Sequence, residues 1–414
     1  MNNDAIFIAD SLSRLKTYCE AEDYKGWDPY DGLNSRLFKA IPLAGRSAIC
    51  RLVWIQLFKR CPFNLRRIAL VPKQHNAKGI GLFIEGYLRL HDAVVAQPQL
   101  TARFGSTDEL RGRIERLGEL LLEMRTPGFS GSAWGYNFPW QCRREFLFPA
   151  GEPTVVATNF CATALLEASA LTGRDDFRQA ALDAAGFVMN DLRRTPHAGG
   201  VILSYSRMPG NDTIYNASLL GSRLLSYCYS AGGATDDSLR ELARDSVAAC
   251  CADQRADGSW TYGVKPVTGW IDSFHTGYNL DGIAAYMRLT GDQSFESNLE
   301  RGLDYYLRTF FDPQTGAVKY YHDRTYPVDI HCPGQLPMTL SRTGRYGEHR
   351  GLVHAVLRRA VDTMQAPDGY FYYQLKNGIS SRISYMRWSN AFMFAALATA
   401  LAEETKDNES DQTD

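Results

Sequence analysis

Two kinds of helical segment alternate along most of this chain, and their alternation limits the fold more than any other feature. One kind is apolar on every side, and the other has one charged side. The apolar kind is predicted at 79–93, 159–171, 216–230, 279–290, 335–342 and 390–402. The kind with a charged side is predicted at 109–124, 175–193, 237–253, 294–310 and 348–365. Because helices without a polar side are buried, the chain predicts an inner and an outer layer of helices.

An Asn near the start of four apolar segments shows that the alternation is a repeat. Asn216 follows Asn159 by 57 residues, and Asn279 follows Asn216 by 63. Asn390 comes 111 residues after Asn279, which is about two repeats. One such unit cannot bury its own apolar side, so about six units are expected to close into a ring lined by the apolar helices.

The connections between the helices repeat as well. The turn LTGRDDF at 171–177 is similar to LTGDQSF at 289–295. A Gly-rich, aromatic segment follows each outer helix and predicts a short β-hairpin arm. These segments are GSAWGYNF (131–138), GGVILSYS (199–206), DGSWTYGV (257–264), TGAVKYYH (315–322) and DGYFYYQL (368–375). The expected fold class is therefore dominated by helices, with hairpin arms at one end of the ring.

This pattern resembles the six-hairpin toroid, the (α/α)6 scaffold of many glycoside hydrolases, polysaccharide lyases and uronic-acid epimerases. The resemblance covers roughly residues 70–402 and rests on the repeat, the hairpin motifs and the placement of the loops. No family's catalytic signature is present, so no set of catalytic residues is carried over. The resemblance implies an enzyme that acts on an oligosaccharide or on a precursor of a surface polysaccharide.

Three segments are expected along the chain. Residues 1–70 are predicted to form a helical extension that packs on the ring, and residues 71–402 the toroid. The acidic, polar tail at 403–414 is predicted to be disordered. Within the extension, residues 36–60 are apolar and basic with helical spacing, broken near Pro42 and Gly45.

Overall composition excludes several classes of partner. Lys and Arg number 45 against 46 Asp and Glu, and a net charge of −1 points to neither a nucleic acid nor a membrane surface. No run of about 18 apolar residues predicts a membrane-spanning helix, and the N-terminus lacks a signal-peptide pattern. The nine Cys have no metal-ligand spacing and are expected to be buried free thiols. We expect a cytoplasmic protein with no metal or cofactor and a saccharide substrate; association between copies of the chain is left open.

The strongest catalytic candidates lie in two loops that lead into neighbouring inner helices. Asp272 and His275 are three residues apart, and Asp329 and His331 occupy the corresponding loop of the next repeat. An Asp near a His can orient the imidazole or raise its pKa, which makes it a usable acid or base. Asp272 also stands where a helix cap is expected.

Aromatic and charged residues near the same end of the ring would suit a sugar, whose C–H faces stack on rings while its hydroxyls form hydrogen bonds. The predicted substrate-binding residues are Trp270, Tyr278, Tyr205, Arg207, Tyr215, Arg387, Trp388 and Asp31. Asp31, with Asp28, has an alternative role in a proline turn. Lys73, His75 and Lys78 could bind an anion at a helix start, although a solvated loop is the simpler interpretation.

Three functions remain open at this stage. Glycoside hydrolysis is favoured and would use Asp272 and Asp329 as its two carboxylates. A uronate lyase or epimerase would instead use His and Tyr as base and acid, with Arg holding the sugar carboxylate. A third alternative is a scaffold that binds carbohydrate without catalysis.

Overall fold

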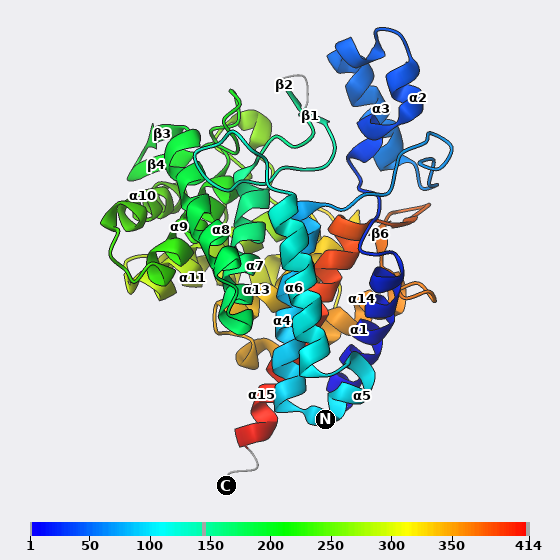
Figure 1. Cartoon of the computed structure of the whole chain (residues 1–414), viewed down its shortest axis with the longest axis vertical. Coiled ribbons are helices and arrows are strands. Elements are labelled where there is room, and N and C mark those ends of the chain that lie inside the picture. Colours follow the sequence, from blue (N-terminus) through cyan, green and yellow to red (C-terminus); the bar gives the residue numbers. More distant parts are fainter. Residues whose placement is uncertain (1, 143–145, 411–414) are drawn as a thin grey trace.

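Six inner helices form a closed ring. The computed structural model describes residues 2–142 and 146–410. The inner helices are α4 (Ala77–Ala96), α7 (Val155–Thr172), α9 (Tyr215–Ala231), α11 (Ser273–Thr290), α13 (His331–Arg342) and α15 (Phe392–Ser410). Each packs on the next along the chain, and α15 packs back on α4. The predicted helical toroid is confirmed (Figure 1).

Six further helices surround this ring. Five of them are α6 (Thr107–Glu123), α8 (Asp175–Gly186), α10 (Asp237–Ala252), α12 (Glu296–Phe310) and α14 (Arg350–Met364). The sixth outer position is filled by α1 (Asn3–Ala21), which packs against α14 and α15. The short helix α5 (Thr101–Phe104) connects α4 to α6, and a π-helical turn at Phe187–Asp191 ends α8.

Burial explains why the two layers differ in sequence. Helix α7 has buried side chains on every side, whereas α12 buries one face with residues such as Leu303 and Tyr306. Glycines let the inner helices approach closely: a Cβ on Gly282 would lie 2.8 Å from the carbonyl oxygen of Leu219. The two matching LTG turns are alike in structure, because Gly173 and Gly291 end their helices at φ values of 73° and 78°.

The four repeated Asn residues lie at one end of the ring. Asn159, Asn216 and Asn279 lie in the N-terminal halves of α7, α9 and α11, and Asn390 lies in the π-helical turn Met386–Ala391 before α15. The inner helices therefore begin at a common end, which we call the ring mouth. The loops that lead into them gather there.

Strands are short, and fewer hairpins form than predicted. β1 (Trp140–Cys142) pairs with β2 (Phe146–Phe148), and β3 (Arg194–His197) pairs with β4 (Gly200–Leu203). β5 (Val328–Asp329), β6 (Tyr372–Leu375) and β7 (Ser381–Ser384) form an antiparallel sheet. The predicted arms at 131–138, 257–264 and 315–322 are instead held by isolated bridges, such as Ile214 with Gly263.

Residues 24–76 form a distinct segment, which we call the N-terminal arm. Its helices α2 (Arg36–Ala40) and α3 (Ala48–Arg60) stand away from the ring on the side of the mouth (Figure 1). They have apolar clusters of their own, one of Leu33, Phe38 and Ile55 and another built on Phe58.

The acidic tail begins as a helix. Helix α15 continues to Ser410, through the first eight residues of the tail that the sequence predicted to be disordered. The buried carboxylate of Glu404 accepts hydrogen bonds from His354 and Asn2, which ties the helix end to the N-terminus. The last four predicted tail residues, 411–414, lie outside the described residues.

One helix of the described chain, α7, is long and apolar enough to cross a membrane by composition. It is an inner helix, and 72% of that stretch is buried inside the protein. Its apolar character is therefore explained by its place in the ring.

Candidate active site at the ring mouth

Asp272 and His275 form a hydrogen-bonded pair at the start of α11. Oδ1 of Asp272 accepts the backbone N–H of His275 at 3.0 Å and so caps the helix. Oδ2 lies 2.7 Å from Nδ1 of the His275 ring and also accepts the indole N–H of Trp270 at 2.9 Å. The two roles considered for Asp272, helix cap and partner of an imidazole, are thus both present on its two oxygens.

His275 is the member of this pair that solvent can reach. Its side chain is 20% exposed, whereas that of Asp272 is fully buried. The stacked rings of Tyr262 and Trp270, with centroids 4.5 Å apart, stand beside it, and Tyr262 lies 4.6 Å from the imidazole. A polar imidazole beside flat aromatic faces is the kind of surface that binds a sugar.

A second group of polar side chains lies deeper in the mouth. Nζ of Lys78 donates to the hydroxyl of Tyr278 at 3.1 Å, and this hydroxyl lies 2.9 Å from Nε2 of His331. All three residues are buried. The Phe274 ring connects the two groups, because its centroid lies 4.0 Å from that of His275 and 4.3 Å from that of His331.

Burial sets the protonation of this deeper group. It lowers the pKa of Lys78 well below its usual value, and the nearby Arg387 adds to the effect. It also lowers the pKa of His331 well below its usual value, with contributions from Lys78 and Arg387. His331 is therefore neutral near pH 7, and the hydroxyl of Tyr278 can donate to its Nε2. Nδ1 of His331 has no hydrogen-bond partner among the described residues.

Asp329 and His331 do not form the predicted acid–imidazole pair. The carboxylate of Asp329 accepts the backbone N–H of His331 at 3.0 Å, but its other partners are the indole of Trp388 at 2.8 Å and the amide of Gln374 at 2.6 Å. The His331 ring points to Tyr278 instead. Burial raises the pKa of Asp329 to about 6. The similar position of the two loops, each before an inner helix, hid this difference, because sequence does not show which neighbours compete for the carboxylate.

The N-terminal arm crosses the ring mouth on the side of α15. Nε of Arg387 donates to Oδ2 of Asp28 at 2.6 Å, and both side chains are about 5% exposed. The Tyr30 ring lies 5.7 Å from that of Trp388. Arg387 and Trp388, both predicted to bind substrate, thus contact the arm.

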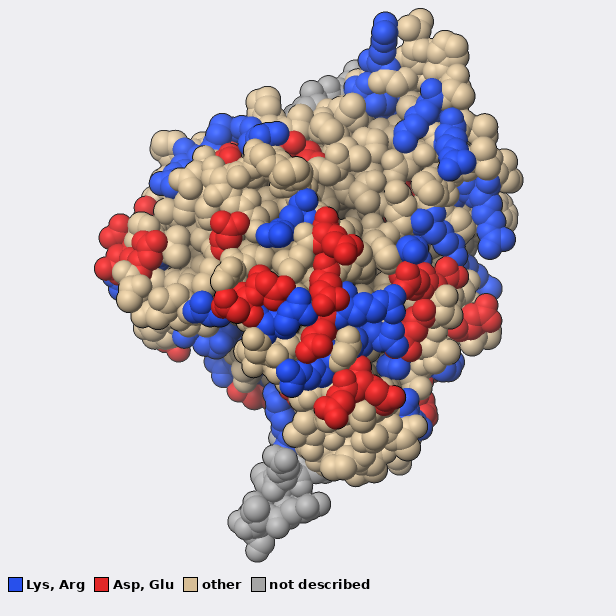
Figure 2. Space-filling view, in the orientation of Figure 1, with Lys and Arg blue, Asp and Glu red and all other residues tan. Residues whose placement is uncertain are grey.

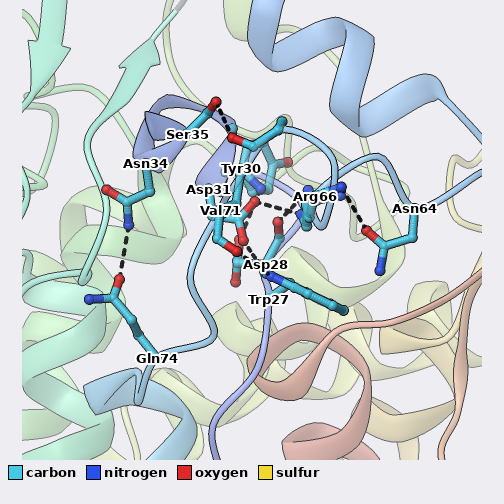
Figure 3. Close-up of polar contacts among 12 residues, drawn as sticks. Trp27, Asp28, Tyr30, Asp31, Asn34, Ser35, Asn64, Arg66, Val71 and Gln74 are labelled. Atoms are coloured by element: carbon cyan, nitrogen blue, oxygen red, sulfur yellow. Dashed lines mark hydrogen bonds and ion pairs between the residues drawn. The ribbon is translucent and has the colours of Figure 1, made fainter. Parts of the chain in front are cut away.

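Asp31 belongs to the internal structure of the arm. Its carboxylate accepts from Nε of Arg66 at 2.7 Å and from the backbone N–H of Asp28 at 2.9 Å (Figure 3). Arg66 also donates to the carbonyl oxygen of Asp28 at 2.6 Å. These bonds fix the loop that carries Asp28, and Asp31 lines a small pocket together with Asp28 and Arg387.

The remaining predicted residues divide between the mouth and its surroundings. Tyr205 lies at the mouth, with its hydroxyl 3.4 Å from that of Tyr136. Arg207 is half exposed, packs over Phe129 and pairs with Glu152 at 3.4 Å.

Tyr215 lies apart from the cluster. Its hydroxyl donates to Asp253 at 2.5 Å, and the same carboxylate oxygen lies 2.6 Å from the ring of His197. Tyr215 and Arg207 thus contact none of the four predicted catalytic side chains in the described hydrogen bonds, although both were expected to bind substrate.

Lys78 is the functional candidate that sequence reasoning underrated. A solvated loop was the favoured interpretation, yet Lys78 is 3% exposed and lies over the rings of Phe160, Tyr278 and Phe392. A positional signal was available. Lys78, His275 and His331 all occupy the first turn of an inner helix, where side chains converge on the mouth.

A larger cavity lies at the opposite end of the ring. It has a volume of about 730 Å³ and is lined by the C-terminal ends of the inner helices. Its central cation, Arg342, is paired with Glu85 and Asp281. Because Arg342 is already paired with two carboxylates and no His is among the described residues that line the cavity, the mouth is the better candidate for chemistry.

Comparison with solved structures supports the description of the fold. A glycoside hydrolase family 76 mannosidase from Bacteroides thetaiotaomicron matches at a TM-score of 0.58 and 11% identity, over 98% of this chain and all of that one. An unsaturated glucuronyl hydrolase with dGlcA-Glc-Rha-Glc matches at 0.58 and 15% identity, over 96% of both chains. A cellobiose 2-epimerase from Bacillus thermoamylovorans matches at 0.56 and 12% identity, over 78% of this chain and 87% of that one.

The fold is the (α/α)6 toroid of these enzymes. No protein-family model matches the chain, and no curated protein sequence matches it. At identities of 11–15%, the similarity to these structures concerns the fold and identifies no catalytic residues in this chain.

Proposed function

We propose that this chain is an enzyme that acts on a saccharide by proton transfer at a carbon next to a carbonyl or carboxyl group, as in an epimerase. The observation that carries the proposal is the pair of imidazoles, His275 and His331, that contact one Phe274 ring but have different hydrogen-bond partners. The toroid fold shared with hydrolases and a sugar epimerase supports the wider class of saccharide-acting enzymes.

Epimerisation needs a base on one side of the carbon, a proton donor on the other, and a cation near the oxygen that gains charge. His275 suits the role of base because Asp272 holds Nδ1 and leaves Nε2 to accept a proton. The hydroxyl of Tyr278, between Lys78 and His331, suits the role of donor. Lys78, whose Nζ donates to this hydroxyl, can also donate a hydrogen bond to the oxygen that gains charge.

The proposed step needs no oxidant or reductant. His275 takes the proton from the carbon, and the electron pair of the C–H bond moves towards the neighbouring oxygen, where Lys78 stabilises the charge. Tyr278 then gives a proton to the opposite face of the same carbon. Solvent restores the proton on Tyr278 and removes the one on His275.

The carboxylates at the mouth explain why hydrolysis becomes the second candidate. Hydrolysis with two carboxylates requires both to reach the glycosidic bond. Asp272 is fully buried and bonded to Trp270 and His275, and Asp329 is enclosed by Trp388 and Gln374. One observation still favours hydrolysis: the pKa of Asp329, raised to about 6 by burial, is suited to a general acid.

Incubation with saccharides in D2O separates these functions. Cellobiose, a mannan oligosaccharide and dGlcA-Glc-Rha-Glc are suitable probes, since solved structures of the same fold are described with such compounds or enzymes. Proton NMR of an epimerase shows deuterium entering one sugar carbon without cleavage, whereas a hydrolase creates a new reducing end. Binding without either change would support the scaffold alternative and refute both enzymatic proposals.

A matched pair of variants locates the activity. We expect His275→Ala to lower the rate by about 100-fold or more, since a positioned acid or base typically contributes that much. His197→Ala is the control, because His197 also pairs with an Asp and is 21% exposed, but lies away from the mouth cluster. Equal loss in both variants, or none in His275→Ala, would refute the assignment.

A further inference from the structure

The N-terminal arm exposes an unusual amount of apolar surface. Nine of the fifteen large apolar side chains that are exposed in the described chain lie between residues 37 and 70. They are Leu37, Ile41, Leu43, Ile49, Val53, Leu57, Phe63, Ile68 and Leu70. The most exposed are Ile68 at 74%, Leu43 at 70% and Phe63 at 68%. Apolar side chains gathered in this way on one segment mark a surface that contacts another body.

Helix α3 shows the feature most clearly. Ile55 and Phe58 face the inside of the arm and are buried. Ile49, Val53 and Leu57 follow one another at intervals of four residues, so they form a single stripe, and each is about half exposed or more. A short helix with water on its outer face would carry polar residues there. Helix α3 is apolar on both faces, so its outer face is suited to an apolar contact.

From residue 32 onward, the charges of the arm are all of one sign. Residues 32–84 hold ten Lys and Arg and no Asp or Glu, whereas the other residues hold 35 Lys and Arg against 46 Asp and Glu. Arg36, Lys39, Arg46, Arg60 and Arg67 are exposed. Figure 2 shows Lys and Arg side chains gathered over the region of α2 and α3. The net charge of −1 for the whole chain conceals this local excess of positive charge.

We propose that the outer face of α2, α3 and residues 61–70 docks on an anionic lipid bilayer. Exposed aliphatic side chains that alternate with Lys and Arg match the two parts of such a surface, since the acyl region accepts the apolar groups and the headgroups attract the cations. A nucleic acid would satisfy the charges but not the nine apolar side chains. An apolar protein partner would satisfy the side chains but gives no reason for the absence of acidic residues.

Docking in this way would bring the ring mouth to the membrane surface. The arm reaches the mouth through Tyr30, which packs on Trp388, and through Lys59, whose Nζ lies 2.7 Å from the Tyr30 hydroxyl. A saccharide presented at a membrane would therefore lie near the candidate site. The docking itself does not depend on the proposed function.

Vesicle sedimentation tests the proposal with the full chain. We expect the protein to sediment with vesicles of phosphatidylglycerol and phosphatidylcholine, but not with phosphatidylcholine alone, and to be released as salt is raised. The variant Arg36→Gln/Lys39→Gln/Arg46→Gln should partition about 100-fold less well, because each basic residue near the surface contributes roughly fivefold. Ile49→Ser/Val53→Ser/Leu57→Ser should also lose binding, with an unchanged circular dichroism spectrum.

A matched control removes apolar groups elsewhere. Ile6, Val95 and Val264 are exposed outside the arm, and their replacement by Ser should leave sedimentation unchanged. Absence of binding to anionic vesicles would overturn the proposal, and so would equal binding by the α3 variant. If the wild-type chain is instead dimeric by light scattering without lipid and the α3 variant is monomeric, the surface belongs to a second copy of the chain and the lipid proposal is wrong.

Discussion

The ion pair between Asp28 and Arg387 should decide how firmly the arm covers the mouth. Both side chains are about 5% exposed, and Nε of Arg387 lies 2.6 Å from the carboxylate. Replacing Asp28 by Asn leaves a buried guanidinium without a counter-charge, which typically costs about 3–5 kcal/mol. Since Asp28 belongs to the arm, we expect the substitution to lower the free energy that holds the arm against the ring more than the free energy of unfolding of the ring itself.

Native-state hydrogen exchange measures that closure directly. The amide of Met386 reports on the contact, because it donates to the carbonyl oxygen of Trp27 in the arm at 3.1 Å. A loss of about 3 kcal/mol makes this amide exchange roughly 100-fold faster in Asp28→Asn, while amides in the middle of α9 keep their protection.

A double-mutant cycle provides the control. Arg387→Met should cost less than Asp28→Asn, and the double variant should recover much of the loss, because no charge then remains buried. Asp304→Asn breaks an exposed pair with Arg308 and should cost no more than about 1 kcal/mol. Unchanged exchange in Asp28→Asn, or energies that add within about 0.5 kcal/mol, would refute the role given to this pair.

Three further outcomes follow from the structure. Burial holds the pKa of Asp329 at about 6, above the unfolded value of 3.8, so its contribution to stability is present at pH 4 and is lost as the pH rises through 6. Urea titrations should therefore show that wild type loses about 3 kcal/mol of unfolding free energy relative to Asp329→Asn between pH 4 and pH 8. Parallel pH dependence of the two proteins would contradict this. Asp272→Asn keeps a helix cap but turns an amide NH2 towards the indole of Trp270 and the imidazole of His275, so unfolding free energy should fall by about 1–3 kcal/mol. Turnover should fall by about 100-fold, and an active variant would exclude the pair from catalysis. Gly282→Ala should lower the free energy of unfolding by about 1–3 kcal/mol, because its Cβ would meet a carbonyl oxygen of α9. Gly112→Ala is the control: it has open space around it on α6 and should be neutral or stabilising. Equal urea midpoints for the two variants would show that the inner helices are not tightly packed.

The ring could be predicted because each helix carries its own burial pattern. Apolar residues on every side, repeated after 57 and 63 residues, identify buried helices without any knowledge of their partners. The sixth outer helix was harder to see. Helix α1 belongs to the extension in sequence, yet it packs against α14 and α15, a contact between opposite ends of the chain that no local pattern reveals.

The candidate site was predicted in part for a similar reason. The bond between Asp272 and His275 lies within one helical turn, so the spacing alone could suggest it. The side chain of Asp329 accepts hydrogen bonds from Trp388 and Gln374, which lie on other elements, and the hydroxyl of Tyr215 donates to Asp253. Lys78 meets Tyr278 across 200 residues of sequence. Such long-range contacts arise from closure of the ring, which a pattern along the chain does not specify.

The position of a bound saccharide tests the central claim most directly. Crystals of the chain soaked with cellobiose or with the saccharide that shows turnover should contain the sugar at the ring mouth, stacked on Trp270 and within hydrogen-bond distance of His275. A sugar bound instead in the cavity beside Arg342 at the opposite end, with the mouth empty, would contradict the account.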